Sequence, residues 1–211
     1  MSQPCDRACT IPAPGQVDKS LGEFWVENPW EIVKKGHNLS CFERNRTWMN
    51  VHGSNFLDLS YLTGTDSDGD GRSVVAGDFS NNGRQDLIVR QAGGGPLLFF
   101  ENNYPQRHYL KVSLRGQSNR LGVGARLKAV VKGQQLVREM FPVNSYRSQM
   151  PNIVHFGLGE AERVERLEIR WPSGKTQILT DLAADKHIVV DEGKEGTAAI
   201  ETVVPGRTIR P

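Results

Sequence analysis

The sequence predicts an all-β fold, and two observations support this prediction. From Arg46 onward, short apolar runs alternate with clusters of Gly, Asn, Asp and Ser, which is the pattern of strands joined by tight turns. Almost no segment repeats its apolar residues at the helical spacing of about 3.6 residues. Many short strands at even spacing are typical of β-sandwiches and β-propellers.

The candidate strands fall into two groups along the chain. The first group lies in residues 23–104 and contains TWMNV, FLDLSYL, SVVAGDF, DLIVRQ and PLLFFEN. The second group lies in residues 105–192 and contains HYLKVSL, ARLKAVV, QLVREMF, IVHFGLG, RVERLEIRW, QILTDL and HIVVDE. Because a propeller blade takes about four strands and a ring about four to eight blades, five strands predict a partial propeller-like sheet. The second group predicts a C-terminal β-sandwich-like domain.

The two ends of the chain differ from this pattern. Residues 1–22 are rich in Pro, Gly, Ser and Gln, which predicts a flexible N-terminal arm. The aromatic segment FWVENPWEIV follows, and we expect it to pack on another part of the protein. Residues 193–211 are polar and predict a loosely ordered tail. An odd cysteine count cannot close a disulfide framework, so the state of these three is left open: Cys5, Cys9 and Cys41.

Composition and missing motifs argue against several function classes. The part after Tyr104 carries 17 basic and 11 acidic residues, but no Lys/Arg run of five that would follow a phosphate backbone. No apolar run is long enough to span a bilayer, and the first residues lack the order of a signal peptide. The sequence also lacks GxSxG, GxxxxGK[ST] and HExxH. We therefore expect no nucleic-acid binding, no membrane insertion and no enzyme activity.

The segment DFSNNGRQDLIV has the spacing of a calcium loop. Alternate oxygens of a tight turn converge on one point, a glycine allows the chain to reverse, and a backbone carbonyl adds a further ligand. Since only two of its residues bring charge, the loop predicts weak calcium binding. An Asp/Asn turn whose side chains cap their own backbone is the alternative. The expected ligands are Asp78, Ser80, Asn82, the carbonyl of Arg84, and Asp86.

A second acidic stretch precedes this loop. Asp66, Asp68 and Asp70 stand at alternate positions before Gly71, but the ninth position is Val74, so the ligand set is incomplete. We therefore treat this stretch as a weaker metal candidate or as a turn. A pair of carboxylates can also cleave glycosides, so a hydrolase that uses the acidic cluster is a further alternative.

Two segments resemble known families. DFSNNGRQDLIV, with DGRSVVAGDF before it and PLLFFENN after it, resembles the FG-GAP/VCBS repeat that forms propeller blades and holds calcium. Downstream, SNRLGVGARLKAVV, SYRSQ and HFGLGEAERVERLEIRWPSGKTQ are similar to the ASPIC/UnbV domain. Together they cover residues 38–191 and resemble the cartilage acidic protein-like family. In the repeat, the positions of Ser80 and Asn82 more often carry Asp or Asn followed by Asp, which implies weak Ca²⁺ binding here.

The resemblance implies a secreted or cell-surface protein of the adhesion type, with no reaction attached. The expected partner is an unknown macromolecular or glycan ligand. A purely structural role, in which the C-terminal domain caps a propeller edge, is the alternative. Since five strands cannot close a ring, we also expect self-association through an uncovered sheet edge.

Overall fold

The computed structural model confirms the all-β prediction, with thirteen strands among the residues it describes. These residues are 15–16, 18, 20, 44–51, 53–69, 71–91, 96–143, 145–194 and 198–201. The aromatic segment FWVENPWEIV and the three cysteines lie outside them. No helix among the described residues has the length and apolar character needed to cross a membrane. The chain forms two compact units, residues 1–70 and residues 71–211, and each is described by itself.

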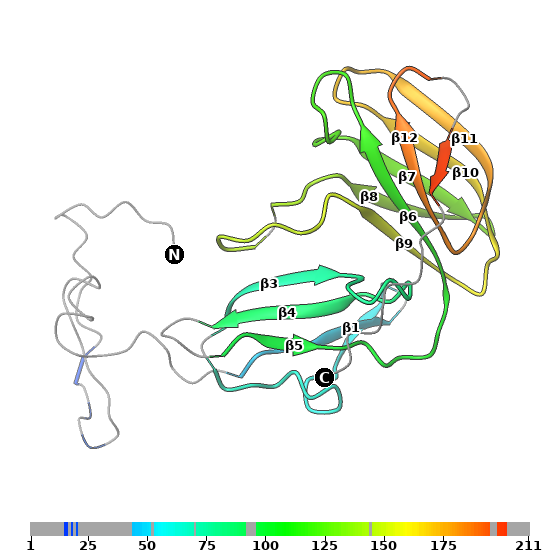
Figure 1. Ribbon diagram of the computed structural model, residues 1–211. Helices are drawn as coiled ribbons and strands as arrows, with labels where there is room; N and C mark the ends of the chain where they lie inside the picture. Colours follow the sequence, from blue (N-terminus) through cyan, green and yellow to red (C-terminus); the bar gives the residue numbers. More distant parts are fainter. Residues whose placement is uncertain are drawn as a thin grey trace, which may run out of the picture. The chain divides into compact units, whose positions relative to one another are not determined.

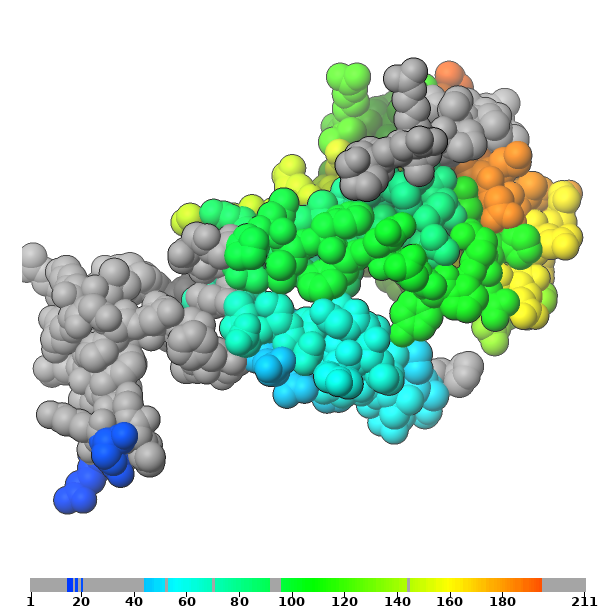
Figure 2. All heavy atoms as spheres, turned by 60° about the horizontal axis from the view of Figure 1, so that its bottom comes forward, coloured from blue at the N-terminus to red at the C-terminus, as the bar shows by residue number. Residues whose placement is uncertain are grey.

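The first unit contains one antiparallel hairpin, formed by β1 (Trp48–Val51) and β2 (Asn55–Asp58). β2 is shorter than the apolar run FLDLSYL predicts, because the amide of Thr63 donates to the carbonyl of Leu59 and closes a turn. A two-stranded hairpin buries little apolar surface. The described residues of this unit form the blue-to-cyan surface in Figure 2. Its exposed large side chains are Trp48, Met49, Phe56, Leu57, Tyr61 and Leu62.

The second unit begins with a three-stranded antiparallel sheet in the order β3-β4-β5, seen in Figure 1. Its strands are β3 (Gly71–Gly77), β4 (Asp86–Gln91) and β5 (Leu98–Phe100). The predicted calcium loop is the connection from β3 to β4, so both of its ends are held by strands.

The rest of the second unit is a β-sandwich of two four-stranded sheets, β11-β10-β7-β8 and β13-β12-β6-β9 (Figure 1). Every pairing within these sheets is antiparallel except the parallel pair β6 and β12. The strands are β6 (His108–Arg115), β7 (Arg126–Val131), β8 (Gln134–Glu139), β9 (Val154–Gly159), β10 (Arg163–Arg170), β11 (Thr176–Ala183), β12 (Lys186–Asp191) and β13 (Ala198–Glu201).

Most residues of the apolar core are strand residues of the sandwich, which largely alternate with outward-facing ones, as the period of two predicts. On β10, for example, Leu167 and Ile169 are fully buried, whereas Arg166 and Arg170 are exposed. Trp171 follows this strand and is 2% exposed, and its indole N–H donates to Gln177 at 3.1 Å. The core therefore satisfies the polar atom of its largest aromatic residue.

Two features differ from the sequence prediction. β13 lies in the stretch 193–211, which the sequence predicts as a loosely ordered tail, and it forms a strand by pairing antiparallel with β12. The units divide between residues 70 and 71, whereas the two groups of candidate strands predict a boundary near residue 104. The β3-β4-β5 sheet thus belongs with the sandwich.

We predict that Leu167→Ala lowers the free energy of unfolding by about 2–5 kcal/mol, because it opens a cavity at a fully buried position. Ile178→Ala on β11, where the side chain is 46% exposed, serves as the matched control and should cost roughly 0.5 kcal/mol. Urea denaturation measures both. Equal losses for the two variants would contradict the assignment of the core.

Candidate functional site

The acidic loop between β3 and β4 is closed by its own backbone. The two carboxylate oxygens of Asp78 accept hydrogen bonds from the amides of Asn82 and Gly83, each at 2.9 Å. The side-chain oxygen of Asn82 in turn accepts the amide of Arg84 at 2.8 Å. Such contacts are those of an Asx-type turn, which stabilises itself without a ligand.

A lysine from the sandwich supplies the positive charge that faces this loop. The ammonium of Lys111, on β6, lies 2.8 Å from Oδ2 of Asp78, and each of the two side chains is 3% exposed. The same ammonium lies 3.4 Å from the side-chain oxygen of Asn81 and 5.5 Å from the centroid of the Tyr109 ring. A buried carboxylate is thus paired with a buried ammonium.

Asp86 points to a different partner. Its carboxylate is fully buried and accepts the amides of Phe79 at 3.2 Å and Asn102 at 2.9 Å. Asp86 therefore ties the loop to the segment after β5, whereas Asp78 ties it to β6. Ser80 is exposed.

The oxygens of this loop, in the arrangement that the structure shows, do not fit the predicted calcium site. Calcium needs six to eight oxygens that converge on one point. Here the oxygens of Asp78, Asn82 and Asp86 accept N–H groups instead. Among the residues that the structure describes, no three His, Cys, Asp or Glu side chains are grouped to hold a metal. Calcium at this loop stays a prediction that metal titration decides.

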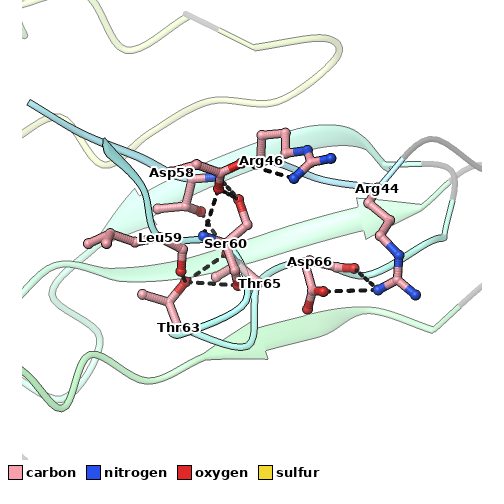
Figure 3. A network of polar contacts seen from close by, with 9 residues as sticks. Arg44, Arg46, Asp58, Leu59, Ser60, Thr63, Thr65 and Asp66 are labelled. Carbon is pink, nitrogen blue, oxygen red and sulfur yellow. Dashed lines mark hydrogen bonds and ion pairs between the residues drawn. The ribbon is translucent and has the colours of Figure 1, made fainter. Parts of the chain in front are cut away.

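The earlier acidic stretch lies in the first unit and pairs with an arginine. Arg44 Nη1 lies 2.9 Å from Oδ2 of Asp66 and 3.0 Å from its carbonyl oxygen, as Figure 3 shows. Asp68 is exposed, and Asp70 lies outside the described residues. The guanidinium of Arg44 therefore forms an ion pair with Asp66, one of the three carboxylates predicted as weaker metal ligands.

A second carboxylate in Figure 3 anchors the end of β2. The hydroxyl and the amide of Ser60 both donate to Asp58, and Arg46 Nη1 lies 2.9 Å from its other oxygen. These contacts, led by the Ser60 hydroxyl, hold the pKa of Asp58 below its usual range. The polar network thus stabilises the turn after the hairpin.

Sequence reasoning missed the residues of the sandwich that meet the Asp78 loop. His155, on β9, stacks on Tyr109 with ring centroids 5.9 Å apart, and its Nε2 lies 2.9 Å from the carbonyl oxygen of Gly83. Burial lowers the pKa of His155. The one available signal was a lysine in the middle of the apolar run HYLKVSL, but its partner lies 33 residues away in the sequence.

Gly83 allows the loop and the sandwich to approach each other closely. It has a φ of 86°, and a Cβ at this position would lie 2.1 Å from two carbons of the Tyr109 ring. No other residue fits both the left-handed backbone and this separation. The glycine of the predicted calcium loop is therefore required here for packing.

A cleft of about 350 Å³ lies beside the loop. His187 lines it, and its Nε2 lies 2.8 Å from the hydroxyl of Ser113 on the neighbouring strand β6. Apolar side chains form much of the wall, namely Phe79, Met140, Phe141, Pro142, Met150, Pro151, Ile153 and Val154. The cleft joins an apolar wall to the polar outer face of β6, β9 and β12.

Comparison with known proteins identifies one domain. Residues 115–197 match the family model described as ASPIC and UnbV, which runs from the end of β6 to the residue before β13. The chain therefore contains an ASPIC/UnbV domain, as the sequence blocks predicted. A search of curated proteins gives no significant match. The resemblance of the upstream part to FG-GAP/VCBS repeats stays a prediction.

We predict that the protein becomes less stable as the pH falls below about 6.5, because the folded state lowers the pKa of His155 below its value in the unfolded chain. In acid, His155 of the unfolded chain binds a proton more readily than His155 of the folded protein. Lower pH therefore favours the unfolded chain until the pH falls below the lowered pKa of the folded state. Urea midpoints between neutral and acid pH measure the slope. His155→Gln, which keeps a donor for Gly83, should flatten it, whereas His108→Gln should leave this contribution in place.

We predict that Gly83→Ala destabilises the protein by about 2–5 kcal/mol, because backbone strain adds to the clash with Tyr109. Gly174→Ala is the matched control. Its φ is 87°, but nothing lies within 4 Å of the added Cβ, so it should show the strain of about 1–2 kcal/mol alone. Denaturant unfolding measures both losses, and a smaller loss at Gly83 would contradict the close approach.

Proposed function

We propose that this chain is a non-catalytic interaction module in which the ASPIC/UnbV domain caps the β3-β4-β5 sheet. The observation that carries the proposal is the set of contacts that the sandwich makes with one edge strand and one loop of this sheet. An end cap protects a sheet from pairing with other chains.

The edge strand β3 is covered by the connection between β8 and β9. The amide of Val74 donates to the hydroxyl of Ser145 at 3.0 Å, and the hydroxyl of Ser73 donates to the carbonyl oxygen of Tyr146. Figure 1 shows this connection reaching toward β3. A backbone donor of an edge strand, which another chain could otherwise pair with, is thus satisfied from within the unit.

The state of the acidic residues supports a role without catalysis. Hydrolysis of a glycoside requires two carboxyl groups that face one substrate. Here Asp78 faces Lys111 and Asp86 faces two backbone amides, so the two carboxylates serve separate contacts. A hydrolase that uses this cluster therefore stands as the weaker alternative, which a glycan-degradation screen with Asp86→Asn addresses.

A second candidate function is binding of a macromolecular or glycan ligand, favoured by the cleft beside the Asp78 loop. Phe79 and Phe141 on its wall are 43% and 59% exposed, and aromatic faces of this kind pack on sugar rings or apolar side chains. Adhesion outside the cell, which the family resemblance implies, belongs to this candidate. Glycan-array binding that Phe141→Ser abolishes would support it.

The capping proposal predicts slow hydrogen exchange at the amide of Val74. Ser145→Ala removes its acceptor, so exchange should accelerate by about fivefold, because the hydrogen bond contributes roughly 1 kcal/mol. Asn152→Ala, which truncates an exposed polar side chain in the same connection, is the control and should leave the exchange rate unchanged. Fast exchange at Val74 in the unaltered protein would refute the cap.

The other edge of the β3-β4-β5 sheet, strand β5, predicts self-association. Among the described strands, β5 pairs only with β4, and Phe99 on it is 54% exposed. We expect the mean mass from light scattering to rise with protein concentration, and Phe99→Lys to reduce this rise because charge opposes edge pairing. A monomeric protein at every concentration would contradict this expectation.

A further inference from the structure

We propose that the ammonium of Lys111 is the built-in cation of the Asp78 loop and takes the role that the loop's spacing assigns to calcium. The inference deepens the capping proposal and rests on it, since Lys111 belongs to a strand of the capping sandwich. It identifies the group that the loop recognises as part of the same chain.

The first argument is electrostatic. A carboxylate at the burial of Asp78 needs a positive partner, because an uncompensated buried charge is strongly destabilising. The two amides that Asp78 accepts orient it but carry no net charge. Lys111, at 2.8 Å, brings the compensating unit of charge.

The second argument is the set of groups around the ammonium. It meets a carboxylate oxygen of Asp78, an amide oxygen of Asn81 and the face of Tyr109. Oxygens and aromatic faces are the groups that stabilise a cation. Asn81 adopts a left-handed backbone with a φ of 54°, which asparagine tolerates. The loop therefore supplies two oxygens to the ammonium, and Tyr109 of β6 supplies an aromatic face.

Competition follows from this arrangement. A divalent ion bound to Asp78 would stand within a few ångströms of the ammonium, and two cations at that separation repel strongly inside a protein. Calcium would therefore have to displace Lys111 and loosen the contact between the loop and β6. Metal binding at Asp78 and docking of the sandwich exclude each other.

Thermal unfolding of the full chain tests the inference, with and without millimolar calcium chloride. We expect calcium to leave the Tm of the unaltered protein unchanged. Lys111→Met keeps the apolar stem but removes the charge, and should lower the Tm by roughly 10 °C. Calcium should recover part of this loss, because it supplies the missing charge to Asp78.

A double variant keeps the test decisive if Lys111→Met folds poorly. Lys111→Met combined with Asp78→Asn buries no net charge, so its Tm should exceed that of Lys111→Met and should not respond to calcium. Lys128→Met is the matched control, since this lysine is 33% exposed and lies 3.6 Å from Glu168. Its Tm should change little and should not respond to calcium.

Two results would overturn the inference. One is a saturable rise in the Tm of the unaltered protein with calcium. The other is a double variant no more stable than Lys111→Met. Hydrogen exchange at Val74 in the unaltered protein separates this failure from that of the cap: slow exchange there leaves the capping proposal standing.

Discussion

The buried ion pair between Lys111 and Asp78 is the constraint on which the arrangement of the second unit depends. Removing both charges from water is costly, and their attraction offsets this cost only while the two groups stay in contact and keep their hydrogen bonds. The main effect of the pair is therefore to fix the position of the Asp78 loop against β6, rather than to add stability. Any position of the loop that separates the two side chains leaves a buried charge without a partner.

The burial of β6 reflects this condition. Leu110, Val112 and Leu114 face the sandwich core, as alternation requires. Tyr109 and Lys111 lie on the opposite face and are buried too, because the Asp78 loop covers them. Strands that lack such a cover behave differently, and β8 has one half-buried residue among exposed ones. β6 therefore packs against the sandwich core with one face and against the Asp78 loop with the other.

The matched ASPIC/UnbV region begins after two of the residues that contact the Asp78 loop. It starts at residue 115, while Tyr109 and Lys111 precede it on the same strand. His155, Ser145 and Tyr146, which also contact the loop and β3, lie within it. The contact with the β3-β4-β5 sheet is therefore built from both sides of this boundary, and the domain would lose part of that contact if it were cut at residue 115.

Local pattern was enough to predict twelve of the strands, because alternation and turn residues are properties of neighbouring positions. The ASPIC/UnbV domain was likewise readable from short blocks in order. β13 was not predicted from the sequence, because this short segment forms a strand through its backbone pairing with β12.

The same limit applies to the candidate site. The spacing of Asp78, Asn82 and Asp86 predicts a calcium loop and leaves a self-capped turn as the alternative, so the sequence by itself determined an acidic turn. The placement of the Lys111 ammonium against Asp78 was decided by tertiary structure. Lys111 and His155 lie side by side on β6 and β9 and reach the loop from 33 and 72 residues away in the chain, and no local pattern encodes such a contact.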